Sequence, residues 1–206
     1  KNCSVCLSSK GNLVTSFDLE DEDYRHSELL TSSIQNILSE NNLDVSGLSA
    51  VSVGIGPGSF TGLRIGFSVA KGLCYPHNID LIGISSLKII ANSVIRENKN
   101  IISLINDKGE HYYISKYSND LKELVEPKIK LIDRDYIFNI LDDDSIIVVN
   151  TDESNEFISD LVNEEIQVFK STISSVDMIS LSHKSLEEKK FEDIAYIEPM
   201  YVKKPY

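Results

Sequence analysis

The chain has 206 residues, 41% of them hydrophobic, which is enough for a packed core and unlike the composition of a disordered segment. Its net charge is −12, and residues 101–206 carry most of it, with 22 acidic and 12 basic side chains. Because nucleic-acid binding depends on Lys and Arg contacts to phosphates, this balance argues against direct binding of RNA or DNA.

Neither a membrane span nor an export signal is expected from the sequence. No run of about 18 apolar residues occurs, and the start at Lys1 lacks the basic-then-apolar pattern of a signal peptide. The chain also lacks an initiator Met, so we expect a trimmed start. Three cysteines, few and odd in number, fit a reducing cytoplasm, where we expect the protein to reside.

The first half of the chain predicts strands and helices in alternation. Apolar residues at helical spacing begin at His26 and end near Asn41. A second helix is expected from a cap at Thr61 to Tyr75, before Pro76. A short third helix is expected from a cap at Ser85 or Ser86 through Ile95. The strands predicted in this half cover residues 3–7, 13–17, 50–55 and 81–84.

The second half predicts a separate set of elements. Residues 101–105 and 111–117 form an expected hairpin around a turn at 107–109. Further strands are expected at 129–132, 146–149 and 168–169, and helices at 136–141, 157–162 and 176–182. The polar run at 96–100 separates the two halves, so we predict two α/β lobes, residues 1–97 and a smaller, acidic one of 98–206, with return of the last residues to the first lobe as an open alternative.

A glycine-rich loop, GIGPGSFTGLRIG at residues 54–66, joins a predicted strand to the second helix. It lacks the lysine of a Walker loop, and Ser59 stands where a dinucleotide fingerprint needs its third glycine. It does not match the G-x-S-x-G nucleophile pattern either. The amides at the helix start could still hold an anion, so phosphate binding remains an alternative.

The helix after the loop is apolar nearly all round, which requires cover on more than one side. Gly62, Gly66 and Ala70 follow one another at four-residue spacing and would let another helix approach closely. One interpretation is a central helix of the protein's own core. The other is a helix with one face on its own sheet and another on a partner chain; the first helix offers similarly small residues at 31–33.

The other groupings of reactive residues do not indicate a functional site. Cys3 and Cys6 match C-x-x-C, but residues three apart on a strand point to opposite faces, so we expect a structural role. The four histidines show no spacing that would place a metal pair on a helix. The run Asp142–Asp144 is interpreted as a charged loop rather than a cation site.

Residues 50–87, AVSVGIGPGSFTGLRIGFSVAKGLCYPHNIDLIGISSL, resemble the signature of the bacterial TsaB (YeaZ) family. RHSELLTSSIQNIL, NCSVCLSSKG and IEPMYVKKP resemble that family's first helix, second strand and closing segment. The resemblance implies an α/β, actin-like ATPase (ASKHA, ribonuclease H-like) fold. It also implies a non-catalytic partner in making threonylcarbamoyladenosine on tRNA, beside a catalytic sister, TsaD, whose H-x-x-x-H metal pair is absent here.

From this resemblance we expect no catalytic residue and no metal site in the chain. Expected partners are a TsaD-like catalytic subunit and a TsaE-like ATPase, with a homodimer when the chain is alone, tRNA contacted only indirectly, and no membrane. ATP or ADP is expected only at an interface with partners. The residues expected to face a partner are Leu29, Ser33, Ile37, Gly62, Leu63, Gly66 and Ala70. Those expected to hold the loop and helix start are Gly56, Gly58, Ser59, Thr61 and Arg64.

One departure from the family concerns the start of the chain. Family members begin with a strand bearing an acidic-Thr-Ser motif, ahead of the segment that matches Lys1, and it is missing here. We expect an omitted start rather than a lobe built without its inner strand, because the neighbouring strands would expose unpaired backbone. Two alternatives in other functional classes are a stand-alone nucleotide-using enzyme of the same fold and an inactive glycopeptidase-like homologue.

Overall fold

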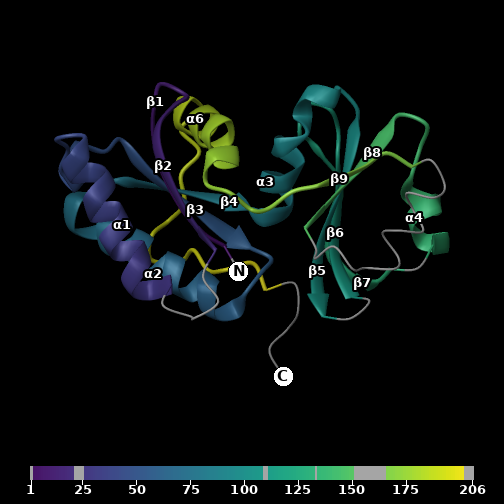
Figure 1. The fold of residues 1–206 in the computed structure, drawn as a ribbon, viewed down its shortest axis with the longest axis horizontal. Helices are drawn as coiled ribbons and strands as arrows, with labels where there is room; N and C mark the ends of the chain where they lie inside the picture. Colours follow the sequence, from purple (N-terminus) through teal and green to yellow (C-terminus); the bar gives the residue numbers. More distant parts are fainter. Residues whose placement is uncertain (1, 21–25, 109–110, 133, 151–165, 202–206) are drawn as a thin grey trace. The chain divides into compact units, whose positions relative to one another are not determined.

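The computed structural model describes residues 2–20, 26–108, 111–132, 134–150 and 166–201 (Figure 1). The chain forms two compact units, one of residues 1–85 and 173–200 and the other of residues 86–172 and 201–206. The division therefore follows Ser85, not residue 97 as the polar run had predicted, and residues 173–200 return to the first unit. The reason is helix α3 (Ser86–Ser93), which packs on strands β5, β6 and β8 of the second unit.

The first unit begins with a β-hairpin. Strands β1 (Asn2–Ser9) and β2 (Asn12–Glu20) pair antiparallel, with Val5 opposite Phe17. Lys10 and Gly11 form the two-residue turn with φ of 49° and 76°, the conformation that matches the twist of the strands. The register shifts by one residue beside Leu7, which is a β-bulge. The predicted strands at 3–7 and 13–17 are confirmed.

A β-α-β unit completes the strands of the first unit. Strand β3 (Ala50–Gly56) pairs parallel with β4 (Asp80–Ser85), and helix α2 (Phe60–His77) makes the connection that parallel strands require. Helix α1 (His26–Glu40) packs on β1 and contacts α2. The hairpin and the parallel pair are separate two-stranded sheets, so none of the described residues supplies an inner strand between them.

Helix α2 differs at both ends from the prediction. The cap is Ser59, not Thr61, because the Ser59 hydroxyl accepts a hydrogen bond from the amide of Gly62. The helix also continues past Pro76 and ends at His77, followed by Asn78 in the left-handed conformation. Pro76 removes the hydrogen bond to the carbonyl of Gly72, and this is tolerated in the last turn because Gly72 is exposed and water can reach that carbonyl.

The core of the first unit lies between α2 and the β3–β4 pair. It comprises Val53, Phe67, Ala70, Cys74, Ile79 and Leu81, each at most 9% exposed. Ile194 and Ile197 of the returning segment pack against this core. That segment begins with a 3-10 turn at Val176–Met178 and helix α6 (Ile179–Glu187), and it then joins the outer edge of β4, where the Glu192 amide donates to the Leu81 carbonyl at 2.8 Å.

The second unit is built on one mixed sheet of five strands in the order β7-β6-β5-β8-β9. The strands β5, β6 and β7 form an antiparallel meander, and β8 and β9 add parallel to β5. Their bounds are β5 Asn100–Lys108, β6 His111–Tyr117, β7 Glu123–Leu131, β8 Ser145–Asn150 and β9 Val168–Lys170. The predicted hairpin and the strands at 146–149 and 168–169 are confirmed, while β7 is longer than the expected 129–132.

The centre of the second unit's sheet is buried, because residues 101–105 of β5 and 146–149 of β8 are almost all apolar, the pattern of a strand covered on both faces. Helix α4 (Arg134–Ile140) contributes Ile137, which is fully buried among the side chains of β5, β6 and β8. Short 3-10 turns at Val45–Gly47 and Ile95–Glu97 complete the described elements. The helix predicted at 157–162 lies outside the described residues.

Candidate functional site

The glycine-rich loop packs tightly against the protein itself at the end of β3. Gly56 is buried with φ of 99°, a conformation that favours glycine. A β-carbon at Gly56 would lie 2.9 Å from Leu63 Cδ1 and 3.4 Å from the Met200 carbonyl oxygen. The Met200 amide in turn donates to the Ile55 carbonyl at 2.7 Å. Gly56 is therefore explained by contacts within the first unit.

The start of α2 gathers the other residues that were expected to hold this loop. The Ser59 hydroxyl accepts a hydrogen bond from the Gly62 amide at 3.3 Å, and the Leu63 amide donates to the Ser59 carbonyl at 2.9 Å. Thr61 is exposed, and the Arg64 guanidinium lies 3.8 Å from the centroid of the Phe60 ring, as in a cation–π contact. Gly58 is exposed, and a β-carbon there would meet nothing within 4 Å.

Three of the residues expected to face a partner point inward instead. Ser33 and Ile37 on α1 are 4% and 6% exposed, and the Ser33 hydroxyl donates to the Leu29 carbonyl at 2.6 Å. Ala70 on α2 is 4% exposed and belongs to the core of the first unit. The prediction is corrected for these three side chains: the apolar stripe of α1 covers the unit's own core, and the small-residue stripe of α2 enters that core at Ala70.

The small residues of α2 bring the helix close to its own sheet. A β-carbon at Gly66 would lie 3.7 Å from Val53 Cγ2, so Gly66 faces strand β3. The stripe that contains Gly62, Gly66 and Ala70 continues at the same spacing to Cys74, which is fully buried. Gly62 is exposed, and Leu29 and Leu63 are half-buried, so for these residues partner contact stays a prediction.

The exposed face of α2 is a different stripe, which the sequence reasoning did not single out. It comprises Thr61, Arg64, Ser68, Gly72 and Tyr75, all exposed, and their spacing of three or four residues places them on one side of the helix. Phe60, 48% exposed, and Tyr75, 80% exposed, lie toward the two ends of this face. The available signal was the position of the polar residues, since Arg64, Ser68 and Lys71 are the three polar positions between Leu63 and Tyr75, and two of them lie on this stripe.

Helix α1 lies beside α2 in the first unit, so the two helices form a continuous surface (Figure 1). The exposed positions of α1 include Ser32, Gln35, Asn36 and Ser39, which are small or uncharged. We call the exposed stripe of α2 together with these α1 residues the α1–α2 face. It carries little charge and few long side chains, and an exposed aromatic ring lies near each end of α2.

A polar cluster fastens the returning segment to the hairpin. The Ser4 and Ser175 hydroxyl oxygens lie 2.7 Å apart, and the Ser175 amide donates to the Ser4 hydroxyl at 2.8 Å. Burial raises the pKa of the Cys6 thiol, the hydrogen bond to Ser175 lowers it, and Asp18 adds to the rise. Cys3 and Cys6 are both free thiols, and the cluster explains their surroundings without a disulfide.

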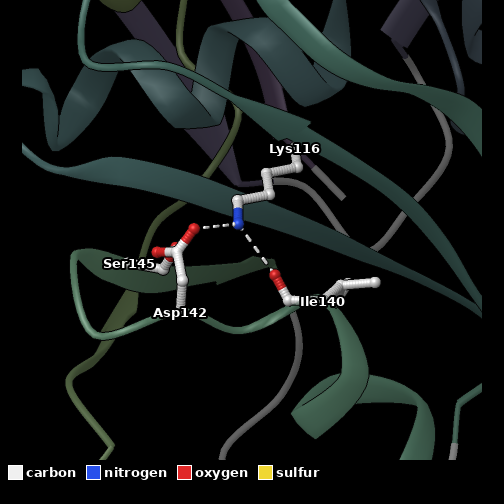
Figure 2. A network of polar contacts seen from close by, with 4 residues as sticks. All are labelled: Lys116, Ile140, Asp142 and Ser145. Carbon is white, nitrogen blue, oxygen red and sulfur yellow. Dashed lines mark hydrogen bonds and ion pairs between the residues drawn. The ribbon is translucent and has the colours of Figure 1, made fainter.

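A second polar network belongs to the second unit and surrounds a buried lysine (Figure 2). The Lys116 ammonium of β6 lies 2.6 Å from an Asp142 carboxylate oxygen and donates to the Ile140 carbonyl at 2.8 Å. The Ser145 hydroxyl donates to the other Asp142 oxygen. Hydrogen bonds from Lys116 and then Ser145 hold the pKa of Asp142 below its usual range. The Lys116 ammonium and the Ser145 hydroxyl both find acceptors within the fold, which is the arrangement of a structural network.

The described part of the chain brings no three His, Cys, Asp or Glu side chains into a group that could hold a metal ion. The expectation that the Asp142–Asp144 run is a loop agrees with this geometry, since Asp142 is engaged with Lys116. Within the same described residues, no helix is both long and apolar enough to cross a bilayer.

Comparison with known proteins places this geometry in a family. The family model of TsaD, tRNA N6-adenosine threonylcarbamoyltransferase, matches residues 20–135, more than half of the chain. Two solved structures cover 97% and 98% of the chain, YeaZ from Pseudomonas aeruginosa and a protein from the same species described as similar to peptidase YeaZ. Their TM-scores are 0.77 and 0.78 at 20% and 19% identity, so they confirm the predicted actin-like α/β fold.

The curated relatives are named for one biosynthetic process. The tRNA threonylcarbamoyladenosine biosynthesis protein TsaB of Escherichia coli K12 is 31% identical over 57% of this chain and 51% of its own length. TsaB of Bacillus subtilis 168 is 32% identical over 54% of this chain and 50% of its own length. A tRNA N6-adenosine threonylcarbamoyltransferase of Anoxybacillus flavithermus is 36% identical over 36% of this chain and 22% of its own length.

The alignments to TsaB span about half the length of those curated relatives. The family model covers the part of the chain that holds the glycine-rich loop and helices α1 and α2. The chain therefore belongs to the family that the TsaD model describes.

Proposed function

We propose that the chain is a non-catalytic partner subunit of a tRNA-modifying complex. In that complex a threonylcarbamoyl group is transferred to the N6 amine of an anticodon-loop adenosine, and a TsaD-like sister subunit performs the transfer. The names of the curated relatives support this process for the chain's family. The chain's part in the process is to bind and activate the sister.

The observation that carries the proposal is the α1–α2 face. Ser68 and Gly72, between Arg64 and Tyr75, leave little side-chain bulk in the middle of this side of α2, which lets a helix of another protein approach closely there. Exposed aromatic rings such as Phe60 and Tyr75 are the residue types that dominate binding energy at protein interfaces. A surface that combines both features suits a protein partner better than a small substrate.

Charge supports an indirect relation to tRNA. A chain with a net charge of −12 repels phosphates, and electrostatic attraction to phosphates supplies essentially all non-specific nucleic-acid affinity. In the proposed complex the sister subunit contacts the tRNA. A TsaE-like ATPase, a nucleotide bound only at a shared interface, self-association of the lone chain, and a location in the cytoplasm complete the proposal.

Calorimetric titration of the chain with the TsaD-like protein of the same organism tests the proposal. Ser68→Arg adds a long charged side chain at the middle of the exposed stripe, and arginine is a good helix former, so the fold is preserved. We expect saturable binding for the wild type and at least about tenfold weaker binding for Ser68→Arg, a loss of about 1.4 kcal/mol.

The matched control is Asn139→Arg, which adds the same side chain to an exposed position of α4 in the other unit. It should bind like the wild type. Equal binding by Ser68→Arg and the wild type would remove the α1–α2 face from the interface, and absence of binding by the wild type would contradict the partner role itself.

A further inference from the structure

A groove runs along the side of α2 in the first unit, between that helix and the returning segment. It has a volume of about 590 Å³, within the range of small-molecule sites. One wall is formed by Lys71 and Tyr75 of α2, and the other by residues 192–195. Ile194, at its base, packs against the core of the unit. The groove is distinct from the polar network around Lys116 and from the glycine-rich loop.

The two walls carry opposite charges that do not neutralise each other. Lys71 is half-buried on the α2 wall and Glu192 is on the facing wall. Within the described part of the chain, neither side chain takes part in a hydrogen bond or ion pair. Lys71 is half-buried and Glu192 is exposed, so two charged side chains without a protein partner among the described residues border the groove, and each offers a binding contact to a ligand of the opposite charge.

Gly83 leaves space for the Glu192 carboxylate because it has no β-carbon. The Glu192 Oε1 atom lies 3.1 Å from where a β-carbon at Gly83 would be, and Ile55 Cγ2 and Ile197 Cδ1 lie 2.7 Å and 3.2 Å from that same point. The carboxylate thus rests over the backbone of β4 beside apolar side chains. Asp193 has a different task, since its Oδ1 accepts from the Ala195 amide at 2.8 Å and shapes the turn.

We propose that this groove binds a small zwitterion with an apolar body, which in chemical class is a free amino acid with an aromatic or large aliphatic side chain. Its carboxylate pairs with the Lys71 ammonium and its ammonium with the Glu192 carboxylate. Its apolar body lies against Ile194 and the ring of Tyr75, which is 80% exposed and so able to turn toward it. This inference does not depend on the proposed function, although Tyr75 borders both surfaces.

The charge arrangement favours a zwitterion over a peptide. A residue inside a peptide carries neither terminal charge, and a residue at one end of a peptide carries a single terminal charge. Only a free amino acid presents both charges about an apolar side chain. Three probes of the same body separate these classes: L-phenylalanine, N-acetyl-L-phenylalanine, which lacks the ammonium, and L-phenylalaninamide, which lacks the carboxylate.

The experiment titrates each probe into the full chain without a partner and follows backbone amide shifts by NMR. We expect L-phenylalanine to saturate at low millimolar concentration, the affinity scale of a small ligand in an open groove, with shifts at residues 71–75 and 192–195. Each singly charged probe should bind about tenfold more weakly, because it forfeits one charged contact.

Two variants test the assignment of each charge. Lys71→Met should weaken L-phenylalanine about tenfold and leave L-phenylalaninamide unchanged, because the amide never used Lys71. Glu192→Gln should weaken L-phenylalanine similarly and leave the N-acetyl probe unchanged. Lys184→Met, at an exposed position of α6, is the control and should change nothing. Amide spectra of each variant in the absence of probe establish that the fold is intact.

The proposal is overturned if L-phenylalanine fails to saturate, or if all three probes bind alike, which would indicate an apolar surface without charge recognition. It is also overturned if Lys71→Met and Glu192→Gln bind L-phenylalanine as the wild type does. Binding of the TsaD-like protein is measured separately, so failure here leaves the proposed function standing.

Discussion

The Lys116 ammonium lies 2.6 Å from the Asp142 carboxylate, and this ion pair fastens strand β6 to the loop that follows helix α4. The lysine side chain is 10% exposed and the aspartate side chain 48% exposed. Removing the aspartate therefore costs more free energy than removing the lysine. The exposed aspartate can be hydrated when it loses its counter-ion, and the buried lysine cannot.

We predict that Asp142→Ala destabilises the chain more than Lys116→Met. Removal of the aspartate leaves a buried ammonium that still donates to the Ile140 carbonyl but has lost its counter-ion, at a cost of about 1–3 kcal/mol. Methionine fills the lysine's space with an apolar chain and leaves Asp142 free to be solvated, so its cost should stay below about 1.5 kcal/mol.

Urea unfolding followed by tyrosine fluorescence measures both variants of this pair. Asp143→Ala, a change at the neighbouring exposed acid, is the control and should stay within about 0.5 kcal/mol of the wild type. A larger loss for Lys116→Met than for Asp142→Ala would show that the lysine contributes through contacts other than the ion pair.

We expect Asp177 and Asp142 to make folding stability depend on pH in opposite directions. Burial, and then the nearby Asp18 carboxylate, raise the pKa of Asp177. A raised pKa means that the folded state binds the proton more tightly than the unfolded state. Stability contributed by the protonated form is therefore lost as the pH rises from the usual aspartate value, about 3.9, through the raised value.

Asp177→Asn keeps the shape and removes the charge, so we expect a higher melting temperature than the wild type at pH 7. The difference should shrink as the pH falls through the usual aspartate range, where the wild-type residue is protonated too. Thermal melts at pH 7 and at acid pH measure this difference. A gain that is the same at both pH values would mean that it comes from packing or hydrogen bonding rather than from charge.

The glycines of the first unit should respond differently to the same substitution. A β-carbon at Gly72 meets nothing within 4 Å, so Gly72→Ala should stabilise α2 by up to about 1 kcal/mol, the difference in helix propensity. A β-carbon at Gly83 would lie 2.7 Å from Ile55 Cγ2, which branches directly from a strand residue, so Gly83→Ala should destabilise by about 1–3 kcal/mol. Chemical unfolding of the two variants beside the wild type measures the contrast, and equal effects would contradict these packing assignments.

Substitutions at Gly66 distinguish a position in the core from a position at a partner interface. Its β-carbon would lie 3.7 Å from Val53 Cγ2, which is ordinary contact, so Gly66→Ala should be neutral or stabilising. Gly66→Leu would push a branched side chain into strand β3 and cost about 1–3 kcal/mol. Melting temperatures at low protein concentration test this pair. An unchanged melt for Gly66→Leu would mean that Gly66 faces away from the sheet, as a partner contact requires.

Much of the fold could be predicted from residue pattern alone. Residues 146–149 of β8 form a continuous apolar run, and residues 101–105 of β5 form one interrupted only by Ser103; such runs bounded by polar residues leave few other interpretations. The orientation of α2 could not be predicted in the same way. Its sequence is apolar nearly all round, so periodicity gives no single inward face, and the position of Ala70 in the core depends on where β3 lies.

The boundary between the units illustrates a second limit. The polar run at 96–100 looked like a linker, yet it is occupied by a 3-10 turn and the start of β5. The chain leaves the first unit at Ser85, between two ordered elements, because α3 follows β4 directly. Composition identifies linkers that lack structure, and it cannot identify a boundary where one element ends and the next begins at once.

The central claim, that this chain is a required but non-catalytic partner, is tested most directly by reconstituting tRNA modification. Threonylcarbamoyladenosine is measured in unmodified tRNA after incubation with the adenylate donor, ATP, the TsaD-like protein and the TsaE-like protein, with and without this chain. The account predicts modification only when the chain and the TsaD-like protein are both present, and none with the chain alone. Modification of tRNA by the chain alone, or equal modification in its absence, would contradict it.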